Sequence, residues 1–90
     1  DITPENISIN IYPNPFNSSC NIDIYSGQDT DAKIMITNIL GNHVETINSK
    51  VTRQKGNNFL LNAKNYPSGN YFVSVMFEED VYTRQITLLK

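Results

Sequence analysis

Apolar and polar residues alternate along most of the chain, and this period of two is typical of β-strands with one buried face. In the first predicted strand, Ile7, Ile9 and Ile11 point to one side, and Ser8 and Asn10 point to the other. The same pattern predicts strands at residues 7–12, 20–25, 32–38, 43–47, 58–62, 71–77 and 81–89. In 71–77 both rows of side chains are partly apolar, which favours a central position in a sheet.

Polar turn sequences separate the predicted strands. Gly41 tolerates a positive φ, Pro67 holds φ near that of a turn, and Gly69 is again free to become positive. Residues 48–57 are polar and predict a long loop, and residues 78–80 predict an acidic hairpin loop. Short strands with frequent turns and no amphipathic helix pattern indicate an all-β fold, an immunoglobulin-like antiparallel β-sandwich of about seven strands.

A chain of 90 residues is long enough for one domain. Residues 1–6 are polar apart from Ile2, include Pro4 and precede the first alternating segment, so they are interpreted as a linker or a frayed start. Residues 7–90 are predicted to form a single β-sandwich domain.

The composition argues against two classes of partner. The net charge is −2, and no run of Lys or Arg exists that would neutralise several phosphates, so nucleic-acid binding is not expected. No segment approaches the roughly 20 consecutive apolar residues of a transmembrane helix. The sequence therefore predicts neither a nucleic-acid-binding protein nor a membrane-spanning one.

Few residues offer catalytic chemistry. Cys20 is the only cysteine and shares an apolar face with Ile22 and Ile24, so a small buried side chain is the preferred interpretation. His43 is the only histidine, and it is interpreted with Glu45 as a polar pair on a solvated strand face. Because the chain has one cysteine and one histidine, the residue count alone does not exclude Cys20 and His43 as a catalytic nucleophile and its base. We expect no enzyme activity.

Metal and cofactor sites are not predicted either. Zinc requires several Cys or His ligands, and the chain has one of each. The acidic clusters at 29–31 and 78–80 lack the ligand spacing of a calcium loop, so they are interpreted as solvated turns.

The five tyrosines raise an alternative function, because aromatic rings stack on sugar rings. They are Tyr12, Tyr25, Tyr66, Tyr71 and Tyr82. The sequence shows no regular outward row of them on one sheet. A permanent accessory module of a secreted enzyme, which binds carbohydrate or acts as a spacer, is kept as the alternative.

The stretch YPNPFN, residues 12–17, interrupts the alternation. Pro13 and Pro15 lack backbone donors and predict an extended exit from the first strand. Asn14 and Asn17 are expected to hydrogen-bond within their own turns. Phe16 is expected to turn inward and close one end of the sandwich.

Four stretches in this order carry a specific resemblance: YPNPFN, ITNILGNHV, PSGNYFVSV and a final strand that ends in TLLK. Together with KGNNFLLN they resemble the C-terminal sorting domain of type IX secretion (Por secretion system) cargo proteins, in its type A form. The residues that match the family motifs are Tyr12, Pro13, Asn14, Pro15, Phe16, Asn17, Asn38, Leu40, Gly41, Gly56, Pro67, Gly69 and Tyr71. One departure is Gln85, which stands where the family usually has a lysine, beside Arg84 on the opposite strand face.

The resemblance implies a secretion signal and no reaction or cofactor. Such domains follow a passenger in the same chain, and they direct it through the periplasm of a Gram-negative bacterium to the cell surface or the medium. The implied partners are the type IX translocon, an outer-membrane shuttle protein and a sortase-like cysteine peptidase that removes the domain.

The last strand is the predicted recognition segment. A final strand often lies at a sheet edge, where unpaired backbone groups accept a strand from a partner. We therefore expect partners to recognise Arg84, Ile86, Leu88, Leu89 and Lys90.

Overall fold

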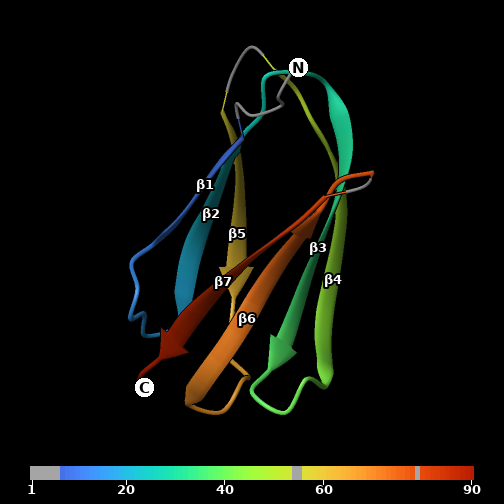
Figure 1. The fold of residues 1–90 in the computed structure, drawn as a ribbon. Helices are drawn as coiled ribbons and strands as arrows, with labels where there is room; N and C mark the ends of the chain where they lie inside the picture. Colours follow the sequence, from blue (N-terminus) through green and yellow to red (C-terminus); the bar gives the residue numbers. More distant parts are fainter. Residues whose placement is uncertain (1–6, 54–55, 79) are drawn as a thin grey trace.

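The computed structural model describes residues 7–53, 56–78 and 80–90 as two β-sheets packed face to face (Figure 1). Its strands are β1 (Ser8–Tyr12), β2 (Ser19–Tyr25), β3 (Thr30–Asn38), β4 (His43–Val51), β5 (Asn57–Asn62), β6 (Gly69–Met76) and β7 (Val81–Leu88). One sheet has the order β1-β2-β5, the other β4-β3-β6-β7, and all strand pairs within them are antiparallel. The predicted seven-stranded antiparallel β-sandwich is confirmed. The predicted linker at residues 1–6 lies outside the described residues.

The core lies between the two sheets and consists of the inward rows that the alternation predicted. Each strand contributes every second side chain, because successive side chains point to opposite faces. The fully buried apolar residues include Cys20, Ile22, Ile24, Ile34, Ile36, Val51, Leu61, Val73, Val75, Ile86 and Leu88. Burial of these aliphatic side chains is the main source of stability in a domain of this size.

Strand β4 is longer than the sequence predicted. The prediction ended it at Ile47 and made 48–57 a loop, but the strand continues to Val51, which is completely buried. Its second half pairs with the start of β3, where Asp31 lies opposite Lys50. The local pattern concealed this continuation because the inward row passes through the polar Ser49 before it reaches Val51.

Strand β6 lies between β3 and β7, so its predicted central position is confirmed. Strand β7 forms a hairpin with β6, in which Met76 lies opposite Val81 and the Phe77 amide donates to the Asp80 carbonyl at 2.8 Å. Strand β7 is also an edge strand of its sheet, as the sequence predicted.

The sandwich has two distinct ends (Figure 1). The loops that follow β1, β3 and β5 lie at one end, together with the residues after β7. We call this the motif end and define it as residues 13–18, 39–42, 63–68 and 89–90. The described residues of the connections after β2, β4 and β6 lie at the opposite end, where β1 also begins.

Candidate functional site

The YPNPFN stretch connects the two sheets of the sandwich. The chain bends at residues 13–15 instead of running extended, so the predicted extended exit is wrong. The peptide bonds Tyr12–Pro13 and Asn14–Pro15 are both cis. The bent segment leaves the β1-β2-β5 sheet and lies against the outer edge of β7 (Figure 1).

Phe16 links this segment to β7 through backbone and side chain. Its amide donates to the Thr87 carbonyl at 2.9 Å, and its carbonyl accepts from the Leu89 amide at 2.8 Å. These two bonds form a short parallel bridge opposite Leu88. The phenyl ring is only 3% exposed, so its predicted inward position is confirmed.

Asn14 extends the same contact by two further hydrogen bonds. Its Oδ1 accepts from the Thr87 amide at 3.0 Å, and its Nδ2 donates to the Gln85 carbonyl at 3.2 Å. The side-chain amide thus forms the two kinds of hydrogen bond that the backbone of a neighbouring strand would form. The adjacent prolines cannot donate such a bond, because they have no backbone N–H. The prediction that Asn14 bonds within its own turn is wrong, because its partners lie 71 and 73 residues away. We call residues 14–16 and these bonds the clamp.

The clamp divides the outer edge of β7 into two halves. From Gln85 to Leu89 the outward backbone groups are bonded to the clamp. Because outward-facing residues alternate along an edge strand, Thr83 also faces outward, in the half that the clamp does not cover. There the Arg84 guanidinium donates to the Thr83 carbonyl at 3.1 Å. The sequence predicted an open edge over residues 84–90, and this is wrong for most of that segment, because the clamp covers the edge from Gln85 to Leu89.

The structure separates the five predicted recognition residues by accessibility. Ile86 is 1% exposed and Leu88 is completely buried, so a partner has no access to either side chain in the folded domain. Arg84, Leu89 and Lys90 are exposed. Of the five predicted residues, only these last three have side chains that a partner can reach in the folded domain.

Lys90 is held in place at the motif end. Its amide donates to the Ser68 hydroxyl at 3.1 Å, and its Nζ donates to the Lys64 carbonyl at 2.6 Å. Leu89, the preceding residue, is bonded through its amide to Phe16. The last two residues therefore have defined positions although their side chains are exposed.

The β3–β4 turn displays a second apolar group at this end. The Asn38 side-chain oxygen accepts from the Leu40 amide at 2.9 Å and from the Asn42 amide at 3.0 Å. Gly41 has a φ of 84°, the left-handed conformation that glycine adopts without strain. This network holds the turn while Leu40 remains 81% exposed and Ile39 62% exposed.

The β5–β6 turn is fixed by two tyrosines. The Tyr71 hydroxyl donates to the Pro67 carbonyl at 2.5 Å, an arrangement like the tyrosine corner of immunoglobulin-like sandwiches. Tyr66 packs on Tyr71 with ring centroids 5.5 Å apart and donates a hydrogen bond to Glu45. Burial, followed by this bond to a carboxylate, raises the pKa of Tyr66 well above its usual value. Gly69, with a φ of 152°, ends the turn.

The motif residues thus meet at one end of the sandwich, which sequence reasoning missed. They occupy the connections after β1, β3 and β5 and the end of β7, and alternate connections of antiparallel strands lie at the same end. The positions of the motifs in alternate connections along the chain could therefore have predicted that they meet at one end. Gly56 is the exception, because it lies at the opposite end, just before β5, and is exposed.

Cys20 and His43 do not form a reactive pair. Burial raises the pKa of the Cys20 thiol to about 11, so the reactive thiolate is scarce at neutral pH. His43 begins β4 in the other sheet, where its Nε2 is hydrogen-bonded to the Thr46 hydroxyl at 2.5 Å. The predicted pairing of His43 with Glu45 is wrong, because Glu45 accepts its bond from Tyr66.

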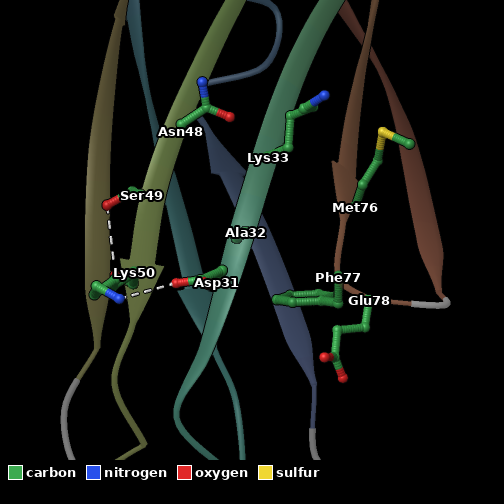
Figure 2. A pocket seen from close by; sticks show the side chains of 9 residues that line it. All are labelled: Asp31, Ala32, Lys33, Asn48, Ser49, Lys50, Met76, Phe77 and Glu78. Atoms are coloured by element: carbon green, nitrogen blue, oxygen red, sulfur yellow. Dashed lines mark hydrogen bonds and ion pairs between the residues drawn. The ribbon is translucent and has the colours of Figure 1, made fainter.

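A hollow of about 640 Å³ lies along β4, β3 and β6, toward the opposite end. Figure 2 shows its lining, which consists of Asp31, Ala32, Lys33, Asn48, Ser49, Lys50, Met76, Phe77 and Glu78. Lys50 pairs with Asp31 at 3.2 Å, and the Ser49 hydroxyl donates to the Lys50 carbonyl rather than to a base. This geometry offers no activated nucleophile. Within the described residues no group of three His, Cys, Asp or Glu is placed to hold a metal ion.

The outer face of the β1-β2-β5 sheet carries a polar cluster. The Tyr12 hydroxyl donates to Asp23 at 2.7 Å, and Asn58 donates to the same carboxylate. These bonds, that of Asn58 first, lower the pKa of Asp23. Tyr25 is also half exposed on this sheet.

Residues 10–88 match the family model of the secretion system C-terminal sorting domain, the Por secretion tail. The chain belongs to this family. A sorting domain of the Por secretion system directs the secretion of its cargo protein and is a non-catalytic module. Its cargo is secreted or displayed at the surface of Gram-negative bacteria.

No curated protein matches the chain. Among solved structures, the sorting domain is similar to part of dimeric latent PorU from Porphyromonas gingivalis, with a TM-score of 0.77 and 14% sequence identity. The match covers 98% of this chain and 10% of that chain, so it supports the fold alone. The part of this sorting domain that the structure describes contains no helix long and apolar enough to cross a membrane.

Proposed function

We propose that the folded sandwich is the sorting signal itself and that the exposed residues of its last segment are recognised by the secretion machinery. The observation that carries this proposal is the fixed display of Leu89 and Lys90. Their backbone is held by Phe16 and Ser68, while the side chain of Leu89 is 57% exposed. A preorganised segment loses little conformational entropy on binding.

The partners in this proposal are the type IX translocon and an outer-membrane shuttle protein. They bind the domain in the periplasm, and a sortase-like cysteine peptidase then removes it from its passenger. The passenger precedes the domain in the same chain. This arrangement is supported by the fold, because β1 begins at the opposite end and a passenger there leaves the motif end free.

The proposal is tested by fusing the 90 residues to a fluorescent reporter with an ordinary signal peptide. We expect export past the outer membrane in a Gram-negative host that has the pathway, and periplasmic retention in the same host without the translocon. Retention in both hosts would contradict the sorting function of this chain.

The recognition residues need substitutions rather than a deletion, because removing Leu88 would also open the core. Leu89→Ser and Lys90→Glu change exposed side chains and should lower export of the fusion. Thr83→Ser, on the half of β7 that the clamp does not cover, is the matched control and should be exported normally. Normal export of both test variants would contradict recognition through the last segment.

The alternative, a permanent carbohydrate-binding module or spacer, has less support. Tyr66 and Tyr71 pack on each other, and Tyr82 packs against Phe77 at 5.9 Å. These three rings are therefore engaged within the domain. Tyr12 and Tyr25 are half exposed on the outer face of the β1-β2-β5 sheet, but they lie at its opposite ends, since Tyr12 is opposite Asn21 and Tyr25 is opposite Ser8. The mass of the exported protein separates the two functions, since an accessory module remains attached whereas a cleaved sorting domain is missing.

A further inference from the structure

We propose that the signal is a composite surface of the motif end, formed by two connections and the residues after β7, and that it binds a protein surface that is apolar and acidic. This inference rests on the proposed function and deepens it, since it adds residues far from the last strand. Its apolar part consists of Ile39, Leu40 and Leu89, and its charged part of Lys64 and Lys90.

The register of the four-stranded sheet brings these residues to one level. Asn38, the last residue of β3, lies opposite Tyr71 of β6, and Tyr71 lies opposite Ile86 of β7. Beyond this level β7 pairs with β6 for two more residues, up to Leu88 opposite Gly69. Ile39 and Leu89 therefore extend past the same end of the sheet. Because neighbouring strands are about 4.8 Å apart, the turn and the end of β7 are separated by roughly 10 Å. A partner surface of ordinary size covers both.

The apolar side chains of this end are held in solvent by rigid backbone. Leu40 is 81% exposed although its amide is bonded to Asn38, and Leu89 is 57% exposed although its amide is bonded to Phe16. A flexible turn would need to be ordered when a partner binds, at a cost in free energy. These two positions are already ordered, which favours tight binding per contact.

The charges of the described residues divide between the two ends and indicate the chemistry of the partner. The motif end carries the cations Lys64 and Lys90, and the nearby carboxylate of Glu45 in β4 accepts a hydrogen bond from the hydroxyl of Tyr66. The opposite end is richer in carboxylates, namely Asp29, Asp31, Glu78 and Asp80, with Lys50 and Arg53 among them. An acidic partner is therefore attracted to the motif end and repelled from the opposite one.

The first test substitutes the two apolar residues of the β3–β4 turn in the reporter fusion. Ile39→Ser/Leu40→Ser should lower the exported fraction about tenfold, because two of the three exposed apolar contacts of the surface are lost. The matched control is Tyr25→Ser/Val81→Ser, which removes two side chains of 47% and 56% exposure at the opposite end, where β2 ends and β7 begins. The control should be exported as well as the original fusion.

The second test changes charge without touching the turn. Lys64→Glu should also lower export about tenfold, because it reverses the charge that faces the acidic partner. The contact to Lys90 uses the carbonyl of Lys64 and survives the substitution. The control is Lys33→Glu on β3, which should have no effect on export.

The outcomes separate the two proposals. If the original fusion is not exported, the proposed function fails. If it is exported and the Ile39→Ser/Leu40→Ser and Lys64→Glu variants are exported equally well, the sorting function stands and the composite surface is wrong. The midpoint temperature of thermal unfolding of each purified variant should lie within about 4 °C of that of the original fusion, as expected for surface substitutions. If the Ile39→Ser/Leu40→Ser variant unfolds at a lower temperature than this range allows, the export of Lys64→Glu alone decides whether the composite surface is correct.

Discussion

The two halves of β7 differ in what covers their outer edge. From Gln85 onward the outward backbone groups are bonded to the clamp. At Thr83 the outward carbonyl instead accepts a hydrogen bond from the guanidinium of the adjacent Arg84. Both halves belong to one regular strand paired with β6. The difference arises because a bent segment from the other sheet reaches only the second half. An edge strand is thus protected where the last residues must hold a defined position.

The largest effect is expected when the aromatic anchor of the clamp is removed. Phe16→Ala should lower the free energy of unfolding by about 3–5 kcal/mol, because a ring that is 3% exposed leaves a cavity between the sheets. Urea unfolding measures the loss. Hydrogen exchange should also accelerate at the amides of Thr87 and Leu89. Slow exchange at both in the variant would mean that the clamp does not need the ring.

Substitutions of the adjacent residues Leu88 and Leu89 should differ strongly in their effect on the free energy of unfolding. Leu88→Ala should lower the free energy of unfolding by about 2–5 kcal/mol, because the side chain is completely buried. Leu89→Ala, a change of the same chemistry one residue later, should have an effect within about 0.5 kcal/mol. The two variants are compared by urea unfolding under identical conditions. Equal losses would contradict the assignment of one side chain to the core and the other to the surface.

A smaller effect is expected from the amide part of the clamp. Asn14→Ala removes two hydrogen bonds to β7 and should lower the free energy of unfolding by about 1–2 kcal/mol. The Thr87 amide should then exchange with solvent as fast as the Thr83 amide. Asn14→Asp is the informative companion, because it keeps the acceptor for Thr87 and loses the donor to Gln85. It should protect the Thr87 amide better than alanine does.

The smallest effect is expected in the half of β7 that the clamp does not reach. Arg84→Ala removes an exposed bond to the adjacent Thr83 carbonyl and should change the free energy of unfolding by less than about 0.5 kcal/mol. Thermal and urea unfolding both check this. A loss as large as that of Asn14→Ala would show that the two halves of β7 are equally constrained.

Local pattern was enough to predict most of the fold. Ile22, Ile34 and Val73 are fully buried because each stands in an alternating row, and alternation is a property of neighbouring residues. The pattern failed at the second half of β4, where Ser49 interrupts the apolar row and only pairing with β3 extends the strand. Pairing partners are distant in sequence, so the local pattern does not report them.

The candidate site was predictable only in part. The last segment stays a predicted recognition segment, while the common face of Ile86 and Leu88 was predicted from the sequence and is confirmed. Their burial, and the exposure of Leu89 beside them, depends on how the two sheets pack. The gathering of the motifs follows from the strand order, yet the display of Leu40 depends on the hydrogen bonds of the folded turn.

The sequence by itself determined seven strands, the faces they bury and, through its ordered motifs, the family of secretion sorting domains. These features depend on side-chain alternation and turn chemistry, which act over a few residues. Tertiary structure alone decided that Asn14 and Phe16 bond to the end of β7 and leave its first half outside the clamp. Those contacts join residues more than 70 positions apart, and only the packing of two sheets brings them within hydrogen-bond distance.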